Sequence, residues 1–432
     1  MSEERTRASD APELAGLGEA SRLQRDLYLY WSGVARAGGI ALTSRGYVSR
    51  PALRRLREEV AAGEPSALPA ESADGDAEAD LPRLLFIRRA LERLSLLRVT
   101  GAGEGEAQRL EAAETRAMAR YLARPLAERV RMLVRLWLGG AWWPDHLDPR
   151  AGLPGLLMPA APRVAIARRR LIEEIASLAP GEIVPAPQSW RPARAMAAHG
   201  RGARRRVVTR PPARGAAATD DVAPAALAGP LTWLGAVIWD DAAGEWRVGL
   251  PGYALREGRV DGDIASGAAP ELIERHGRVV AQSDLSVIAY PPFSGPELLT
   301  LDLCASRETL SQTARYRLTR AAFAGARDFG WDAAEVTRRL ERLIGVDLPD
   351  ALRVTLGDWE RLASRLRMEE GVTLLEVAAP ETLDALLADR ASAGWGIRRL
   401  TPTAATLAPE FAARARAWLL RHGRLPAMIR AE

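Results

Sequence analysis

One stretch of 37 residues, 183–219, contains no acidic residue, and it constrains the fold more than any other feature of the sequence. Alanine, glycine and proline dominate its composition, so the stretch cannot bury enough apolar surface to form a packed core. We therefore expect a basic arm, or long loop, with folded parts of the chain on either side. The arginines of this basic arm are Arg191, Arg194, Arg201, Arg204, Arg205, Arg206, Arg210 and Arg214.

The length of 432 residues fits two to four domains, at about 100 to 200 residues per domain. No run approaches the roughly 18 apolar residues that a membrane helix needs. The N-terminus lacks the basic-then-apolar pattern of a signal peptide. The single cysteine, Cys304, excludes an internal disulfide and favours a reducing compartment, so we expect a cytoplasmic protein.

All 60 basic residues are arginine, because the sequence contains no lysine. A P-loop needs a lysine to reach the nucleotide phosphates, and protein kinases and Schiff-base enzymes also depend on one. The composition therefore argues against these classes of ATP-driven and covalent chemistry.

The positive charge is concentrated in the middle of the chain. Residues 1–150 carry 23 arginines against 22 acidic residues, residues 151–278 carry 17 against 13, and residues 279–432 carry 20 against 20. The middle section therefore holds nearly all of the net charge of +5. A surplus of this kind attracts polyphosphates such as nucleic acid.

The first section has the pattern of part of a winged helix-turn-helix. Residues 1–20 are expected to form a disordered tail, and apolar residues then recur at helical spacing over 23–34. A glycine pair and a short strand at 40–42 precede a second helix, 49–60, which begins with an N-cap serine. This second helix carries Arg50, Arg54, Arg55 and Arg57.

A solvated acidic loop at residues 61–80 separates this pattern from further helices. Two β-prone, aromatic-rich runs in the middle section predict a hairpin that forms the wing of a second winged helix. The expected elements are helices at 81–94, 107–123, 126–139 and 163–178, a strand at 96–99, and the hairpin of 231–239 with 246–250.

From residue 279 the pattern becomes mixed α and β. The expected strands are 279–289, 366–368, 372–377, 397–400 and 404–407. The expected helices are 295–305, 307–312, 320–329, 332–344, 350–364, 380–389 and 409–421, with Thr319 and Asp332 as N-caps.

Four motifs follow one another in this last third of the chain. They are residues 280–288 (VAQSDLSVI), 314–323 (ARYRLTRAAF) with Ala326, Gly330 and Trp331, 348–359 (LPDALRVTLGDW), and 398–403 (RRLTPT). Their order and spacing resemble the XPB/Ssl-type helicase N-terminal domain, which also occurs in bacterial helicase-associated proteins. The first section resembles the winged-helix region of those proteins, most clearly at residues 42–47 and 129–137.

This resemblance implies a DNA-associated protein rather than a motor. In the XPB-type family the corresponding domain precedes the helicase motor and takes part in protein contacts that regulate it. A similar pairing of winged helices with a clutch-like domain occurs in the XPB-partner subunit of the general transcription and repair factor. We expect no motor here, because the sequence ends at Glu432, so the ATPase residues of the family have no positions to match.

Two basic segments are candidate DNA contacts. The four arginines of helix 49–60 can reach phosphates or guanine edges in a major groove. The alternative is a solvated face that Glu58 and Glu59 partly balance. The basic arm can displace counterions from a phosphate backbone without sequence preference. Its alternative is a linker of biased composition.

The remaining candidates favour structural roles. Trp233, Trp239 and Trp246 can stack on bases, but aromatic residues in a hairpin more often pack against helices, so we expect them in the core. Cys304 lies in an apolar helix, which favours a buried structural thiol over a nucleophile.

No metal or cofactor site is expected. Asp145, His146 and Asp148 lie together, but no further histidine or cysteine completes a metal-binding spacing. Residues 101–105 mimic a nucleotide-binding turn, yet the third glycine is misplaced and Glu104 would repel a pyrophosphate. We interpret this segment as a flexible loop.

The sequence therefore predicts an α+β fold, mostly helical, in three sections. Residues 21–150 and 151–278 are winged-helix-like, and residues 279–432 form a domain of the XPB N-terminal type. The predicted function is non-catalytic: a nucleoid-associated protein that binds duplex DNA and docks a separate helicase or another repair or transcription protein. The alternative is a scaffold without nucleic-acid contact, and an enzyme is a third class for which no nucleophile–base pair stands out.

Overall fold

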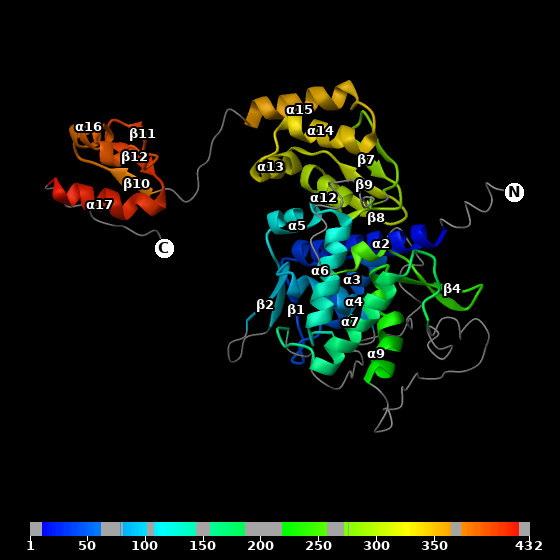
Figure 1. Ribbon diagram of the computed structural model, residues 1–432. Coiled ribbons are helices and arrows are strands. Elements are labelled where there is room, and N and C mark those ends of the chain that lie inside the picture. The colour runs from blue at the N-terminus through cyan, green and yellow to red at the C-terminus, as the bar shows by residue number, and fades with distance from the viewer. Residues whose placement is uncertain are drawn as a thin grey trace. The chain divides into compact units, whose positions relative to one another are not determined.

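A long helix, α2 (Ala11–Arg36), opens the computed structural model of the chain (Figure 1). It begins well before the expected start near residue 23. The additional turns approach the middle section closely, since a β-carbon at Gly16 would lie 2.3 Å from the backbone carbonyl carbon of Gly249. Only glycine fits there, so the first turns of α2 pack against the middle section. The helix ends before Gly38, which has a positive φ, as predicted.

The structure describes residues 11–61, 78, 81–101, 108–143, 156–185, 218–256, 272–274, 276–363 and 373–422. The chain forms two units, Met1–Trp359 and Glu360–Glu432, which are treated separately below. The fold is α+β and mostly helical, as predicted, with several small antiparallel sheets.

The first section of the first unit builds a three-stranded antiparallel sheet with the order β1-β3-β2. Residues 107–123 were expected to form one helix, but they contain β3 followed by α5. Leu110 explains the difference, because it is fully buried and pairs with Ile40 on one side and Val99 on the other. The elements are β1 (Ile40–Ala41), α3 (Arg50–Ala61), α4 (Pro82–Arg93), β2 (Leu97–Thr100), β3 (Arg109–Ala112) and α5 (Thr115–Leu122).

The middle section adds helices and a shorter hairpin than predicted. Its elements are α6 (Leu126–Gly139), α7 (Pro162–Ser177), α9 (Ala218–Leu227), α10 (Pro230–Trp233), β4 (Val237–Asp240), β5 (Glu245–Val248) and the short η3 (Gly252–Ala254). The expected first run, 231–239, begins as helix α10 and becomes a strand only at Val237. Both ends of the segment 183–219, which was expected to be a basic arm, belong to the folded part of the chain. Ile183 forms a β-bridge with Arg247 of β5, and α9 begins at Ala218. All eight arginines of the arm lie outside the described residues.

The last section of the first unit contains a four-stranded antiparallel sheet, with the order β6-β7-β9-β8, and four helices. The expected single strand 279–289 is a hairpin, because Leu285 adopts a φ of 72° in its turn. The expected helix 307–312 is strand β8, which pairs with β9. The elements are β6 (Val279–Ala281), β7 (Ser286–Ala289), α12 (Gly295–Cys304), β8 (Ser306–Leu310), β9 (Ala314–Arg317), α13 (Arg320–Phe329), α14 (Ala333–Ile344) and α15 (Asp350–Ala363).

Helix caps in this section follow the sequence signals. The Thr319 hydroxyl accepts a hydrogen bond from the backbone N–H of Ala322, and the Asp332 carboxylate accepts one from that of Glu335. Ser294 and Glu297 form a reciprocal capping box at α12. The predicted N-caps Thr319 and Asp332 are therefore confirmed.

The second unit has its own small core, which contains Leu383, Leu386, Trp395 and Trp418. Strand β10 pairs with β12, whereas its expected partner, residues 366–368, lies outside the described residues. The elements are β10 (Thr373–Glu376), α16 (Pro380–Ala388), η4 (Arg390–Ser392), β11 (Arg398–Thr401), β12 (Ala404–Leu407), η5 (Pro409–Phe411) and α17 (Ala412–Arg421).

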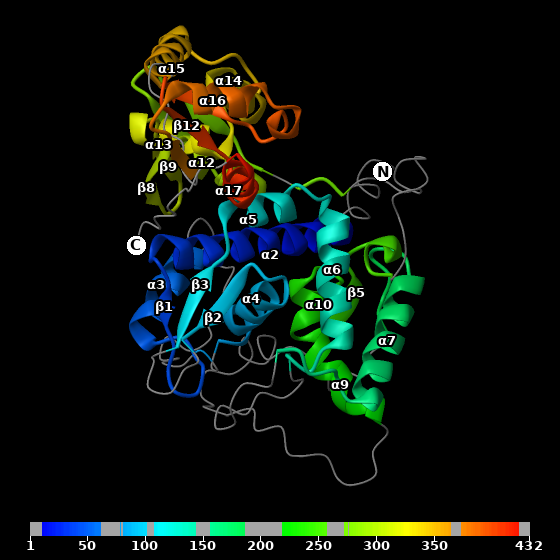
Figure 2. The same cartoon turned by 90° about the vertical axis from the view of Figure 1, so that its left-hand side faces the viewer.

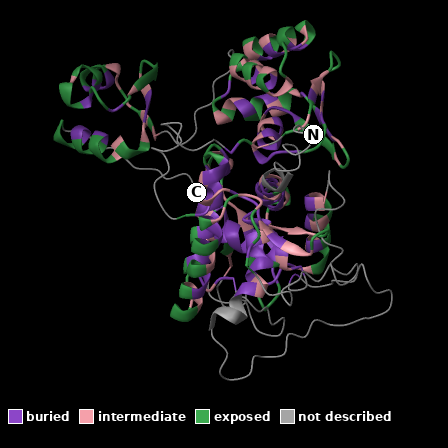
Figure 3. Ribbon diagram, turned by 45° about the vertical axis from the view of Figure 1, so that its right-hand side comes forward, coloured by how far each residue is buried: buried purple, intermediate pink, exposed green. Residues whose placement is uncertain are grey.

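One continuous apolar core runs through the first unit, from α2 to Trp359 of α15. Figure 3 shows buried residues gathered in its interior and exposed residues on the outer sides of its helices. Among the described residues, no helix is long and apolar enough to cross a membrane.

Candidate nucleic-acid interface

Helix α3 presents basic side chains to solvent. Leu53, Leu56 and Val60 bury one side of the helix. Arg54 and Arg55 are exposed on the other side, together with Arg50, while Arg57 is half-buried. The spacing predicted from the sequence therefore places these arginines on the outer face of a packed helix. We call Arg50, Arg54 and Arg55 the α3 arginine face.

The acidic residues of α3 balance this face less than the sequence suggests. Glu58 is exposed, but the Glu59 carboxylate is engaged elsewhere. It accepts a hydrogen bond from Nη1 of Arg307 at 2.9 Å and also pairs with Arg36. Glu59 thus neutralises arginines of other elements rather than those of the α3 arginine face.

Helix α4 follows α3 in the chain, but it is buried on nearly all sides, and its arginines point inward. Asp26 of α2 is completely buried between the guanidinium groups of Arg25, on the same helix, and Arg83 of α4. Its carboxylate accepts a hydrogen bond from Nη2 of Arg25 at 2.7 Å and another from Nη2 of Arg83 at 2.8 Å. The α4 arginines are therefore part of the interior and cannot enter a DNA groove.

A second buried ionic cluster surrounds Glu78, which was expected in the solvated acidic loop. Glu78 is instead fully buried, and its Oε2 accepts hydrogen bonds from the Val48 backbone N–H at 2.7 Å and from Nη1 of Arg88 at 2.8 Å. Burial, and then the Glu78 charge, raise the pKa of Tyr30 well above its ordinary value. The Glu78 carboxylate anchors the end of the acidic segment against α4, so the prediction for this residue was wrong.

Arg307 joins the last section to the N-terminal helices. Its Nε donates to Oδ1 of Asp302 at 2.9 Å, and its Nη1 donates to Glu59. The hydroxyl of Tyr28 donates to the same Asp302 carboxylate, and burial raises the pKa of Tyr28 well above its ordinary value. Within the first unit, the last section is thus joined to α2 by a hydrogen bond from Tyr28 and to α3 by the Arg307–Glu59 ion pair.

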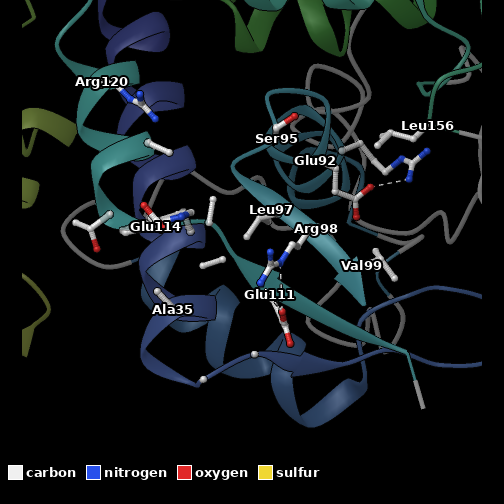
Figure 4. Close-up of a pocket in the computed structure, with 18 residues that line it drawn as sticks. Ala35, Glu92, Ser95, Leu97, Arg98, Val99, Glu111, Glu114, Arg120 and Leu156 are labelled. Atoms are coloured by element: carbon white, nitrogen blue, oxygen red, sulfur yellow. Dashed lines mark hydrogen bonds and ion pairs between the residues drawn. The ribbon is translucent and has the colours of Figure 1, made fainter. Parts of the chain in front are cut away.

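A groove of about 1030 Å³ lies between α2, α5 and the β2–β3 strands (Figure 4). Figure 4 shows Arg98 paired with Glu111 on the strands, at 3.2 Å, and Arg120 on α5 at the opposite end. Arg89 pairs with Glu92 at 2.7 Å on another wall. Because most of its charges are matched in pairs, this groove does not attract polyphosphate as an arginine face does.

Structural roles are confirmed for several other candidates. Trp233 and Trp246 are buried, and the Trp233 ring lies 5.3 Å from the Phe86 ring. Trp239 is partly buried and packs 5.2 Å from Trp246. Cys304 is buried, and burial raises the pKa of its thiol to about 12, which keeps it protonated and unreactive.

The candidate metal ligands and the candidate nucleotide-binding turn cannot be located in the described structure. Asp145, His146 and Asp148 lie outside the described residues, as does most of the glycine-rich segment 101–105. Within the part of the chain that the structure describes, no group of three or more histidine, cysteine, aspartate or glutamate residues is arranged to hold a metal ion.

Glu297 gives the last section a testable pH dependence. Burial raises the pKa of this carboxyl from 4.5 to about 7, so the folded state holds its proton more tightly than the unfolded state. The stabilising contribution of this group is therefore fully present below pH 4.5 and is lost as the pH rises through about 7, by on the order of 3 kcal/mol. The variant Glu297→Gln keeps a capping-box side chain and is expected to remove this loss. Urea unfolding at several pH values checks it, and an unchanged pH profile in the variant would contradict it.

Comparison with known proteins agrees with part of the sequence interpretation. Residues 279–401 match a family model described as a helicase conserved C-terminal domain, so the chain contains a helicase-associated domain. The match begins at β6 and ends in β11, and it covers less than a third of the chain. No curated protein matches the chain.

Proposed function

We propose that the protein is a non-catalytic, helicase-associated protein of transcription or DNA repair that holds duplex DNA through the α3 arginine face and the basic arm. In this proposal, residues 279–432 dock a protein partner, such as a separate helicase. The observation that carries it is a helix with exposed arginines that contacts the helicase-associated domain, while Glu59, one of the two acids that might have balanced those arginines, is bound to Arg307. The resemblance to XPB-type proteins supports the same interpretation.

The chain order of the first section supports a winged-helix interpretation. Helix α2, strand β1, helices α3 and α4 and strands β2 and β3, with the sheet order β1-β3-β2, follow the order of a winged helix-turn-helix. In that motif the second helix of the turn enters the major groove. Here that position belongs to α4, which is buried, so the proposed contact moves to α3.

This contact is expected to be electrostatic and independent of DNA sequence. Guanidinium groups on α3 would bind phosphate oxygens and release counterions. The arm arginines would add further phosphate contacts along the duplex. A buried α4 leaves little opportunity for base readout by a recognition helix.

The double variant Arg54→Glu and Arg55→Glu tests the proposal by filter binding of a duplex across salt concentrations. We expect its DNA affinity at low salt to fall by about tenfold or more. The slope of log affinity against log salt should become shallower by roughly 1 to 2, because two phosphate contacts are lost. The matched control is Arg416→Glu with Arg421→Glu, two exposed arginines of α17 with the same charge change.

A scaffold without nucleic-acid contact makes different predictions. The wild-type protein would then bind no DNA at low salt, or its affinity would not depend on salt. Deleting residues 191–214 also distinguishes the DNA-binding protein from the scaffold. The deletion should lower the DNA affinity of a DNA-binding protein, whereas a scaffold has no DNA affinity to lose. Equal loss in the α3 variant and the α17 control would also contradict a contact at α3.

A further inference from the structure

A second groove lies on the other side of α5, between α5 and the α12–α14 region. It has a volume of about 600 Å³, and an adjoining hollow of about 470 Å³ shares Arg116, Leu303 and Phe329 with it. Figures 1 and 2 show α5 between the N-terminal helix α2 and helix α12 of the helicase-associated domain. We call this the α5 groove.

The floor of the α5 groove is apolar. Leu122 of α5 and Leu299 of α12 are buried beneath it, and Leu303 and Phe329 are partly exposed to it. These side chains come from three different elements that one core holds together. The floor is therefore preformed and offers apolar area to a ligand.

The rim of the α5 groove carries three arginines, Arg116, Arg120 and Arg339, against one acidic residue, Glu114, so it is basic overall. Arg116 and Arg120 are exposed and lie one turn apart on α5, so both project along the same edge. Arg116 donates to the backbone carbonyl of Asp328 at 3.1 Å, and among the described residues neither arginine forms an ion pair. Arg339 on the opposite wall is partly neutralised by Glu335, at 2.5 Å.

We propose that the α5 groove binds an acidic amphipathic peptide segment of a partner protein. Leucine-like side chains of the peptide pack on the floor, and its carboxylates pair with Arg116 and Arg120. Helix-in-groove recognition uses apolar anchors at helical spacing, and the charged rim selects acidic partners. This inference rests on the docking half of the proposed function and does not depend on DNA contact at α3.

A peptide fits the groove better than a nucleic-acid strand does. Bases bind single-strand proteins by stacking on open aromatic faces. Here the Arg339 guanidinium covers the Trp331 ring at 4.1 Å, and that of Arg116 lies 5.8 Å from the centre of the Phe329 ring. A phosphate backbone would also leave the leucine floor unused.

The test uses the full-length protein and a fluorescein-labelled peptide of about 15 residues, with leucines at helical spacing and glutamates between them. We expect fluorescence anisotropy to report saturable binding. The variant Arg116→Glu with Arg120→Glu should weaken it by about tenfold or more. The α3 double variant, Arg54→Glu with Arg55→Glu, makes the same charge change on another helix and is the matched control, so it should bind as wild type does. Circular dichroism checks that each variant is folded.

Three comparison ligands decide what the groove recognises. A peptide with lysine in place of glutamate, and a scramble of the acidic peptide without helical spacing, should both bind at least tenfold more weakly. Equal binding of either one overturns the proposal, as does unchanged binding by the Arg116→Glu, Arg120→Glu variant. A single-stranded oligonucleotide that displaces the labelled peptide, and whose own binding is weakened by Arg116→Glu with Arg120→Glu but not by the α3 double variant, assigns the groove to nucleic acid and also overturns the proposal.

The α3 double variant separates this inference from the proposed DNA contact. It should lose duplex affinity and keep the peptide affinity of the wild type. Peptide binding without any DNA binding would contradict the DNA half of the proposed function alone. DNA binding without peptide binding would contradict the α5 groove alone.

Discussion

Replacing Asp26 by alanine is expected to lower the free energy of unfolding of the first unit by roughly 3 to 5 kcal/mol. Its carboxylate is completely buried and is the shared acceptor of Arg25 and Arg83. The substitution leaves two guanidinium charges in the interior without this acceptor, and their desolvation is no longer offset. Urea unfolding followed by tryptophan fluorescence measures the loss.

A surface ion pair provides the control for this prediction. Arg98 and Glu111 lie 3.2 Å apart, but the Arg98 side chain is 71% exposed. Replacing Glu111 by alanine should therefore cost less than about 1 kcal/mol, because solvent already screens the pair. If Asp26→Ala were no more destabilising than Glu111→Ala, the buried cluster would not be what holds α4 in the interior.

This cluster explains why the proposed DNA contact lies on α3. Helix α4 follows α3 in the chain and would be the recognition helix of a winged helix-turn-helix, but Asp26, Glu78 and Glu92 hold its arginines inward. Moving α4 into solvent would break these contacts at a cost of several kcal/mol. The exposed face of α3 needs no such rearrangement, so it is the surface already available to a phosphate backbone.

The helices could be predicted from the sequence where apolar periodicity and a cap agree. Helices α13 and α14 begin after Thr319 and Asp332, residues whose side chains satisfy the first backbone N–H groups. Strands β3 and β8 were mistaken for helices. Each has only four or five residues, and each becomes a strand through partners that lie elsewhere in the chain, such as Ile40 for Leu110.

The candidate site was predictable to a similar degree. The spacing of Arg50 and Arg54 places them on one side of a helix, and the structure agrees. Nothing local reveals that Arg83 is buried, because its acceptor Asp26 lies 57 residues earlier in the sequence. The i,i+4 spacing of Arg88 and Glu92 signals a pair, yet it does not distinguish a surface pair from an interior one. Tertiary packing decides that difference.

Replacing Arg168 by alanine is expected to destabilise the first unit by about 3 kcal/mol or more. Arg168 lies on α7 beside the exposed Arg169 and Arg170, but its own side chain is almost fully buried. Its Nη1 donates to the backbone carbonyls of Trp137 at 2.6 Å and Gly140 at 3.0 Å, and its Nη2 donates to that of Trp143 at 2.7 Å. The alanine variant leaves these carbonyls at the end of α6 without these donors.

Lysine at position 168 should recover only part of the lost stability, since one ammonium group cannot reproduce the planar fork that reaches several carbonyls. Arg170→Ala on the exposed side of the same helix should change the free energy of unfolding by less than about 0.5 kcal/mol. Equal effects of Arg168→Ala and Arg170→Ala in urea unfolding would contradict the structural role. The burial of Arg168 also affects the argument for DNA binding. Arg168 counts toward the excess positive charge of residues 151–278, but its guanidinium group is buried against backbone carbonyls and cannot contact phosphate. The surface charge available to phosphate in that section must therefore come from its other arginines, which makes the deletion of residues 191–214 the sharper test of the arm.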